Sequence, residues 1–120
     1  MAQSENIFAL DAVVKIYVPG TVDINKPAPE LQAIHTRKTV EFMAGLFGGA
    51  TYGRFVGAWM NDGEMIEEPQ NIVYSYTTKE TAAENLDAVI NYARRLCKEM
   101  EQACITVEYC GRLGFVEPEK

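Results

Sequence analysis

Residues 46–59, LFGGATYGRFVGAW, carry the groups in this sequence that best suit an anionic ligand. Glycines at positions 48, 49, 53 and 57 surround one arginine, Arg54, and several aromatic side chains. Glycines expose backbone N–H groups, Thr51 adds a hydroxyl, and the Arg54 guanidinium matches the geometry of a phosphate. Tyr52 offers a ring face for a nucleobase. The segment therefore predicts a phosphate-binding pocket, although a helix cap followed by a strand explains each glycine singly.

The glycine segment does not match the established phosphate-binding motifs. GGATYG is neither GxGxxG between a strand and a helix nor GxxxxGK[ST]. We expect a helix before these glycines and a strand after them, which is the reverse of the order that points a helix N-terminus at a phosphate. The case for a ligand therefore depends on the side chains rather than on a motif.

The sequence is poor in groups for catalysis or metal binding. His35 is the only histidine, and its polar helical surroundings favour a solvated surface residue over a general base. Cys97, Cys104 and Cys110 lack the spacing of a zinc site, and the acidic clusters at 64–68 and 116–120 lack DxD spacing. We therefore expect no metal, no cofactor and no covalent catalysis.

Length, composition and charge limit the possible partners. The 120 residues fit one domain, residues 1–120, with a single core. A net charge of −6 without a basic run disfavours polymeric nucleic acid, whereas one arginine-lined pocket still suits a small anion. The odd number of cysteines and the absence of a signal-peptide pattern predict a cytoplasmic protein, and no apolar run is long enough to span a membrane.

Hydrophobic periodicity predicts the elements that position these groups. Gly48 and Gly49 directly follow an expected helix, where a left-handed capping glycine belongs, and residues 61–63, Asn-Asp-Gly, predict a hairpin turn. We expect strands at 12–20, 54–60, 64–68, 71–77, 104–109 and 112–117, and helices at 30–47 and 79–101. The order β-α-β-β-β-α-β-β predicts an α+β fold, with two helices packed on one face of a mostly antiparallel sheet.

Further candidates lie outside the glycine segment. Arg112 follows a turn glycine between Tyr109 and Phe115, where a cation and rings would lie together, so it ranks second to Arg54. Arg94 lies near Asn91 on the second helix, where a solvated face is the simpler interpretation. Tyrosines on the expected strands, including Tyr76 and Tyr109, suit the core better than base stacking.

Taken whole, the chain resembles the phage anti-Thoeris proteins of the first type. The resemblance covers residues 16–116 and lies in IYVPGT, FMAGLFGGAT, GAW, an EP before IVYSYT, RLCKEMEQ and VEYCGRLGFV. It implies a sponge for nucleotide signals, which holds cyclic ADP-ribose isomers made by TIR-domain enzymes, such as glycocyclic ADP-ribose, without cleaving them. Some similar proteins also hold cyclic trinucleotides. The resemblance further implies a homo-oligomer, a hexamer built from dimers, with pockets between subunits, acting in the host bacterial cytoplasm.

The residues and the resemblance together predict a binding protein that is not an enzyme. Such a sponge needs cations for a pyrophosphate and apolar walls for adenine, but no general base. A small nucleotide-processing enzyme and an oligomeric protein-binding module stay open as alternatives. The candidate ligand-binding residues are Gly48, Gly49, Thr51, Tyr52, Arg54, Trp59, Tyr76, Asn91, Arg94, Tyr109 and Arg112.

Overall fold

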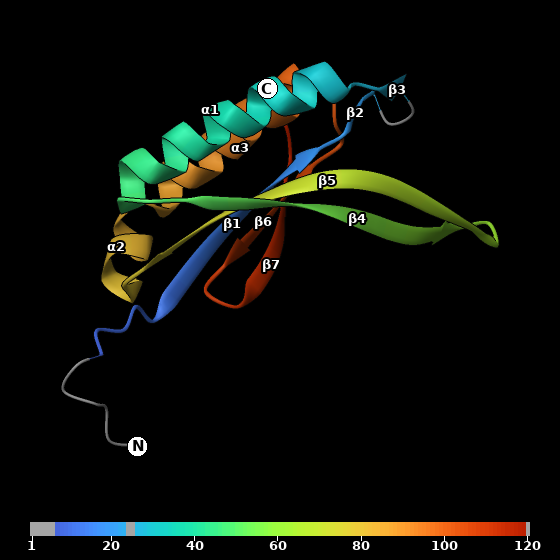
Figure 1. Cartoon of the computed structure of the whole chain (residues 1–120). Helices are drawn as coiled ribbons and strands as arrows, with labels where there is room; N and C mark the ends of the chain where they lie inside the picture. Colours follow the sequence, from blue (N-terminus) through green and yellow to red (C-terminus); the bar gives the residue numbers. More distant parts are fainter. Residues whose placement is uncertain (1–6, 24–25, 120) are drawn as a thin grey trace.

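The structure, a computed structural model, describes residues 7–23 and 26–119 (Figure 1). Its five-stranded antiparallel sheet has the strand order β4-β5-β1-β6-β7, and β2 pairs with β3 separately. The strands are β1 Ala12–Pro19, β2 Thr21–Val22, β3 Lys26–Pro27, β4 Thr51–Asn61, β5 Glu64–Thr77, β6 Ile105–Tyr109 and β7 Arg112–Val116. The helices are α1 Pro29–Phe47, α2 Lys79–Glu84 and α3 Leu86–Glu99. The predicted α+β class and the order of its main elements are confirmed.

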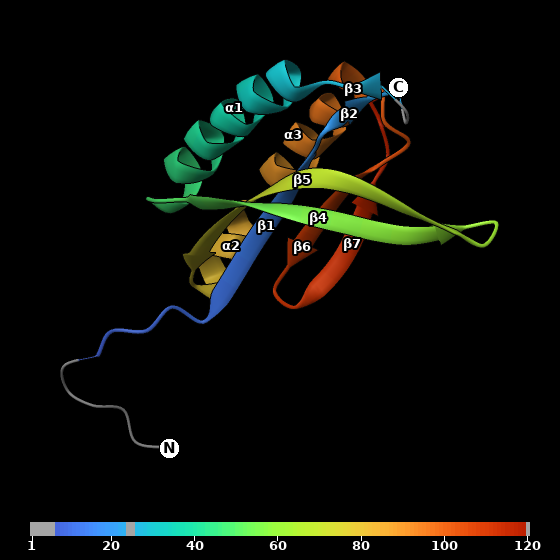
Figure 2. The same ribbon diagram turned by 45° about the vertical axis from the view of Figure 1, so that its right-hand side comes forward.

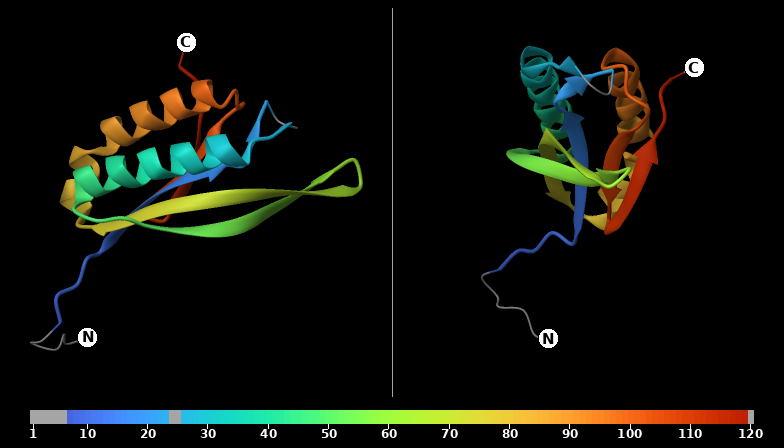
Figure 3. Two further views of the ribbon diagram at one scale, coloured as in Figure 1. Left: turned by 45° about the horizontal axis from the view of Figure 1, so that its top comes forward. Right: turned by 90° about the vertical axis from the view of Figure 1, so that its right-hand side faces the viewer.

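The core lies between the sheet and the helices, which cover one of its faces (Figure 3). β1 alternates in burial, and Val14, Ile16 and Val18 are fully inaccessible because they point toward the helices. α3 contributes Val89, Ala93 and other residues at helical spacing to the same core. No described helix covers the opposite sheet face, where Phe55, Trp59, Tyr76 and Phe115 are exposed and Tyr17 and Tyr74 are half-buried.

β5 is longer than predicted because it runs through Pro69 without interruption. The sequence suggested two strands, 64–68 and 71–77, separated at this proline. In the structure the Pro69 carbonyl points toward α1 and accepts a hydrogen bond from Gln32 Nε2 at 3.3 Å. The Pro69 carbonyl also lies against Gly20, directly after β1 and so on the side of β5 away from β4. The nitrogen and the carbonyl of one strand residue lie on the same side, so the missing N–H of Pro69 removes no hydrogen bond between β4 and β5.

The long helix predicted at 79–101 is two helices, α2 and α3, which meet at Asn85. The Asn85 side-chain amide donates to the Thr81 carbonyl at 2.9 Å. This hydrogen bond offers the Thr81 carbonyl a side-chain partner at the point where the helix is interrupted. The break leaves the apolar face of α3 on the sheet, as its periodicity predicted.

The outer half of the β4–β5 hairpin, residues 55–67, projects beyond the helices and is called the arm (Figure 2). Phe55 and Trp59 lie on one face of the arm, Val56 and Met60 on the other, and all four are exposed. A two-stranded hairpin with no packed face is only marginally stable in water. The arm therefore exposes apolar side chains on both of its faces.

Candidate functional site

The segment that follows α1 forms both a helix cap and part of a hollow. Gly48 has a φ of 91° and its N–H donates to the Ala44 carbonyl at 2.8 Å, as a left-handed capping glycine does. The Gly49 carbonyl accepts a hydrogen bond from Ser75 Oγ at 2.7 Å. Gly48, Gly49, Thr51 and Tyr76 border a hollow of about 540 Å³ that has no arginine or lysine among its lining residues. This hollow has ring faces for a ligand but no cation for a phosphate.

Tyr52 and Arg54 lie in a different hollow, between α1 and β4, which is called the α1–β4 hollow. Its volume is about 420 Å³. Tyr52 and Arg54 are two residues apart on β4, so both point to the side of the sheet that α1 covers. The other lining residues are Ala33, Thr36, Arg37 and Val40 from one side of α1, and Asn71 from β5.

Two guanidinium groups therefore line one hollow. Arg37 Nε lies 3.2 Å from Glu41 Oε1, but both side chains are strongly exposed, so this ion pair is weak. Arg54 forms no salt bridge with any described residue. Two weakly engaged guanidinium forks beside the Tyr52 ring suit an anion that carries a planar, apolar group.

Asn71 forms the polar floor of the α1–β4 hollow. Its Nδ2 donates to Thr36 Oγ1 at 3.0 Å, and Thr36 Oγ1 in turn donates to the Gln32 carbonyl at 2.6 Å. These bonds join α1 to the central part of the sheet. Sequence reasoning missed Thr36, Arg37 and Asn71, although Asn71 occupies a core-facing position of the alternation that continues with Val73 and Ser75.

The other predicted residues are distributed over the rest of the molecule. Arg94 borders a hollow of about 570 Å³, but Glu117 and Glu119 line it too and make it less favourable for an anion. Trp59 borders a hollow of about 210 Å³ together with Glu67 and Glu68. Asn91 is exposed on α3, and Tyr109 pairs with Arg112 across β6 and β7. None of these places brings two arginines together.

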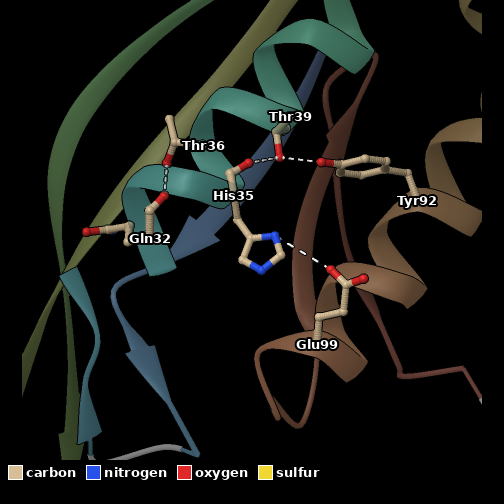
Figure 4. Close-up of polar contacts among 6 residues, drawn as sticks. All are labelled: Gln32, His35, Thr36, Thr39, Tyr92 and Glu99. Atoms are coloured by element: carbon tan, nitrogen blue, oxygen red, sulfur yellow. Dashed lines mark hydrogen bonds and ion pairs between the residues drawn. The ribbon is translucent and has the colours of Figure 1, made fainter. Parts of the chain in front are cut away.

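His35 is buried between α1 and α3, so its assignment as a solvated surface residue is wrong (Figure 4). Only 6% of His35 is exposed, and its Nδ1 lies 3.6 Å from Glu99 Oε2. Thr39 Oγ1 donates to the His35 carbonyl at 2.6 Å, so its hydrogen is used. The Tyr92 hydroxyl, 2.9 Å from Thr39 Oγ1, must therefore be the donor in that pair. These contacts join the two helices.

Burial lowers the pKa of His35 more than the nearby Glu99 carboxylate raises it, and Lys38 lowers it further. The folded protein thus favours the neutral imidazole, and the unfolded chain binds more protons below pH 6.5, the ordinary pKa. We expect the free energy of unfolding to be highest above this pH and to fall as the pH drops below it. His35→Gln should flatten this dependence between pH 7.5 and 5.5 in urea unfolding, and an equally steep decline in the variant would contradict this assignment.

Comparison with known proteins identifies the fold but not a family. No known protein family and no curated protein sequence matches the chain. The structure of a phage SAM lyase in complex with S-methyl-5′-thioadenosine is similar, with a TM-score of 0.61, 13% identity and 98% coverage of both chains. A structure of a phage SAM lyase in the apo state is also similar, with a TM-score of 0.62 and 14% identity. The match covers 99% of this chain and 98% of the lyase chain. The structural similarity shows that this chain shares the fold of a phage protein, and at such low sequence identity it shows the fold alone.

This likeness corrects one prediction from the sequence. The chain was expected not to be an enzyme, but the neighbours that share its fold over nearly their whole length are lyases, which are enzymes. A sequence poor in obvious catalytic groups is therefore no argument against catalysis on this fold.

No described helix has the length and apolar character needed to cross a membrane.

Proposed function

We propose that this protein binds a small adenine nucleotide of the cyclic ADP-ribose class, such as glycocyclic ADP-ribose, in the α1–β4 hollow. Binding would remove a TIR-derived immune signal from the host bacterial cytoplasm during phage infection. The proposal is based on one observation: the same hollow is lined by Arg37, Arg54 and Tyr52. The anti-Thoeris resemblance supports the same ligand class.

The chemistry of the hollow fits such a ligand. A pyrophosphate has two negative charges, and each guanidinium can donate two parallel hydrogen bonds to phosphate oxygens. Tyr52 is 57% exposed, so its ring is available to stack against adenine. Ligand sites generally have volumes of about 300 to 1,000 Å³. The hollow, at about 420 Å³, lies within that range.

Charge favours small anions over polymers. The chain has a net charge of −6, so a long nucleic acid would be repelled by most of the surface. Cyclic trinucleotides are the second ligand class of the proposal, because they carry few charges and expose bases at their rim.

The proposed assembly is a homo-oligomer, a hexamer built from dimers, in which arms contact neighbouring copies. β4 is an edge strand, and Arg54 is its only charged residue. An edge with so few charges is open to pairing with another strand. Tyr52 and Arg54 lie on this strand and line the α1–β4 hollow. A second copy of the chain that paired with β4 would therefore also form part of the wall of this hollow.

Cleavage of S-adenosylmethionine is a second candidate function, favoured by the lyase neighbours. One experiment separates the two. The protein is incubated with glycocyclic ADP-ribose or, separately, with S-adenosylmethionine, and the free, bound and heat-released small molecules are identified by mass spectrometry.

We expect depletion of free glycocyclic ADP-ribose and unchanged S-adenosylmethionine. Heat release will show whether the nucleotide is held intact or converted. Formation of S-methyl-5′-thioadenosine, with glycocyclic ADP-ribose left free, would replace the proposal by the second function. No change in either compound would contradict both.

A further inference from the structure

The Asn71 side chain presents a carbonyl oxygen that the protein itself does not use. The hydrogen of Thr36 Oγ1 is donated to the Gln32 carbonyl, so Thr36 can only accept from Asn71. This fixes the orientation of the amide, with Nδ2 toward Thr36 and Oδ1 on the other side. Oδ1 is buried and has no hydrogen-bond partner, the one such side-chain atom found among residues 7–23 and 26–119.

A buried acceptor without a donor is unfavourable, and native proteins rarely keep one without a reason. Asn71 lines the α1–β4 hollow and pairs with Arg54 in the β4–β5 ladder. Tyr52 lies on the same sheet face, diagonally across from Asn71. The residue that carries the unused oxygen therefore lies beside the groups proposed to hold the phosphate and the base.

We infer that Asn71 Oδ1 accepts a hydrogen bond from the 6-amino group of the bound adenine and so selects adenine over bases without that donor. This inference rests on the proposed function. A base stacked on Tyr52 would direct its edge toward the floor of the hollow, while the phosphates extend to the arginines. Oδ1 is shielded from water in the free protein, so access requires a side chain to turn aside. The exposed Tyr52 and Arg54 are the candidates, and no salt bridge among the described residues holds Arg54.

At such a position, replacing the amine of the base with a carbonyl should change the binding affinity strongly. The 6-amino group of adenine donates to Oδ1, whereas the 6-carbonyl of hypoxanthine would place two acceptors against each other. Sites built to hydrogen-bond one group strongly reject analogues without it, because the buried protein group is then left unpaired. Asn71 would thus be a specificity-determining residue.

The test compares glycocyclic ADP-ribose with its deaminated hypoxanthine analogue by titration calorimetry. We expect the parent protein to bind the adenine compound at least about ten-fold more tightly, the effect of one hydrogen bond that is lost. Asn71→Leu removes the acceptor and should bring the two affinities together. Thr106→Val, which removes a polar group on β6 outside the α1–β4 hollow, should keep the preference of the parent.

The outcomes separate this inference from the proposed function. If the parent binds neither compound, the proposed function fails and this inference fails with it. If the parent binds both equally, or Asn71→Leu keeps the preference for adenine, only the inference on Asn71 is overturned. Should Asn71→Leu not fold, the double variant Thr36→Val/Asn71→Leu removes both hydrogen-bonding partners together and provides the same comparison.

Discussion

Arg54→Lys is expected to weaken binding of glycocyclic ADP-ribose by about ten-fold to more than a hundred-fold. A phosphate held by a guanidinium fork in a partly dry hollow is a charge-assisted contact, which contributes roughly 1.5 to 3 kcal/mol. Lysine keeps the charge but lacks the planar pair of donors. Arg37→Lys should have an effect in the same direction, because Arg37 lines the same hollow. Titration calorimetry measures both affinities.

Arg112→Lys is the matched control for these variants. Sequence reasoning ranked Arg112 second to Arg54, but the structure places it on β7, across the sheet from β4. Binding by the Arg112 variant should equal that of the parent, and all three variants should keep the parent melting temperature because the arginines are outside the core. If Arg112→Lys weakens binding and Arg54→Lys does not, the α1–β4 hollow is not the site.

Substitutions in the arm are expected to have a large effect on the assembly of the oligomer. Trp59→Thr/Met60→Thr replaces one exposed apolar residue on each face of the arm with a polar residue that favours strands. We expect light scattering at micromolar concentration to show an oligomer for the parent and a monomer for this variant. The arm lies outside the buried core, so the variant should still fold.

Ile34→Thr provides the comparison for the arm variant, because Ile34 is also an exposed apolar residue but lies on α1. It should leave the oligomer mass unchanged. A parent protein that is already monomeric at micromolar concentration would remove the proposed oligomer and its shared pockets. An arm variant with the parent mass would show that assembly uses another surface.

Elements defined by local spacing could be predicted from the sequence, and contacts between distant segments could not. The helical periodicity of α3 and the capping position of Gly48 depend on residues close in sequence, and both are present in the structure. The continuity of β5 through Pro69 depends instead on which neighbouring strand that proline faces. A residue-by-residue pattern does not contain this information.

The α1–β4 hollow shows the same limit. The strand predicted at 54–60 includes Arg54 but not Tyr52, so the sequence pattern did not place the two on one face. It also did not show that α1 covers that face and brings Arg37 beside them. Asn71 joins the hollow through the register of β4 with β5, in which it pairs with Arg54. His35 was misassigned for a similar reason, because α3 buries it from a distant part of the chain.

Chemical-shift mapping shows whether the nucleotide binds between α1 and β4. Glycocyclic ADP-ribose is titrated into ¹⁵N-labelled protein, and amide shifts are followed in TROSY spectra. Binding between α1 and β4 should produce the largest changes at Thr36, Arg37, Tyr52 and Asn71. Changes clustered instead around Ile90, Arg94 and Phe115, with the α1–β4 residues unmoved, would contradict it and place the ligand in the hollow beside the C-terminal segment.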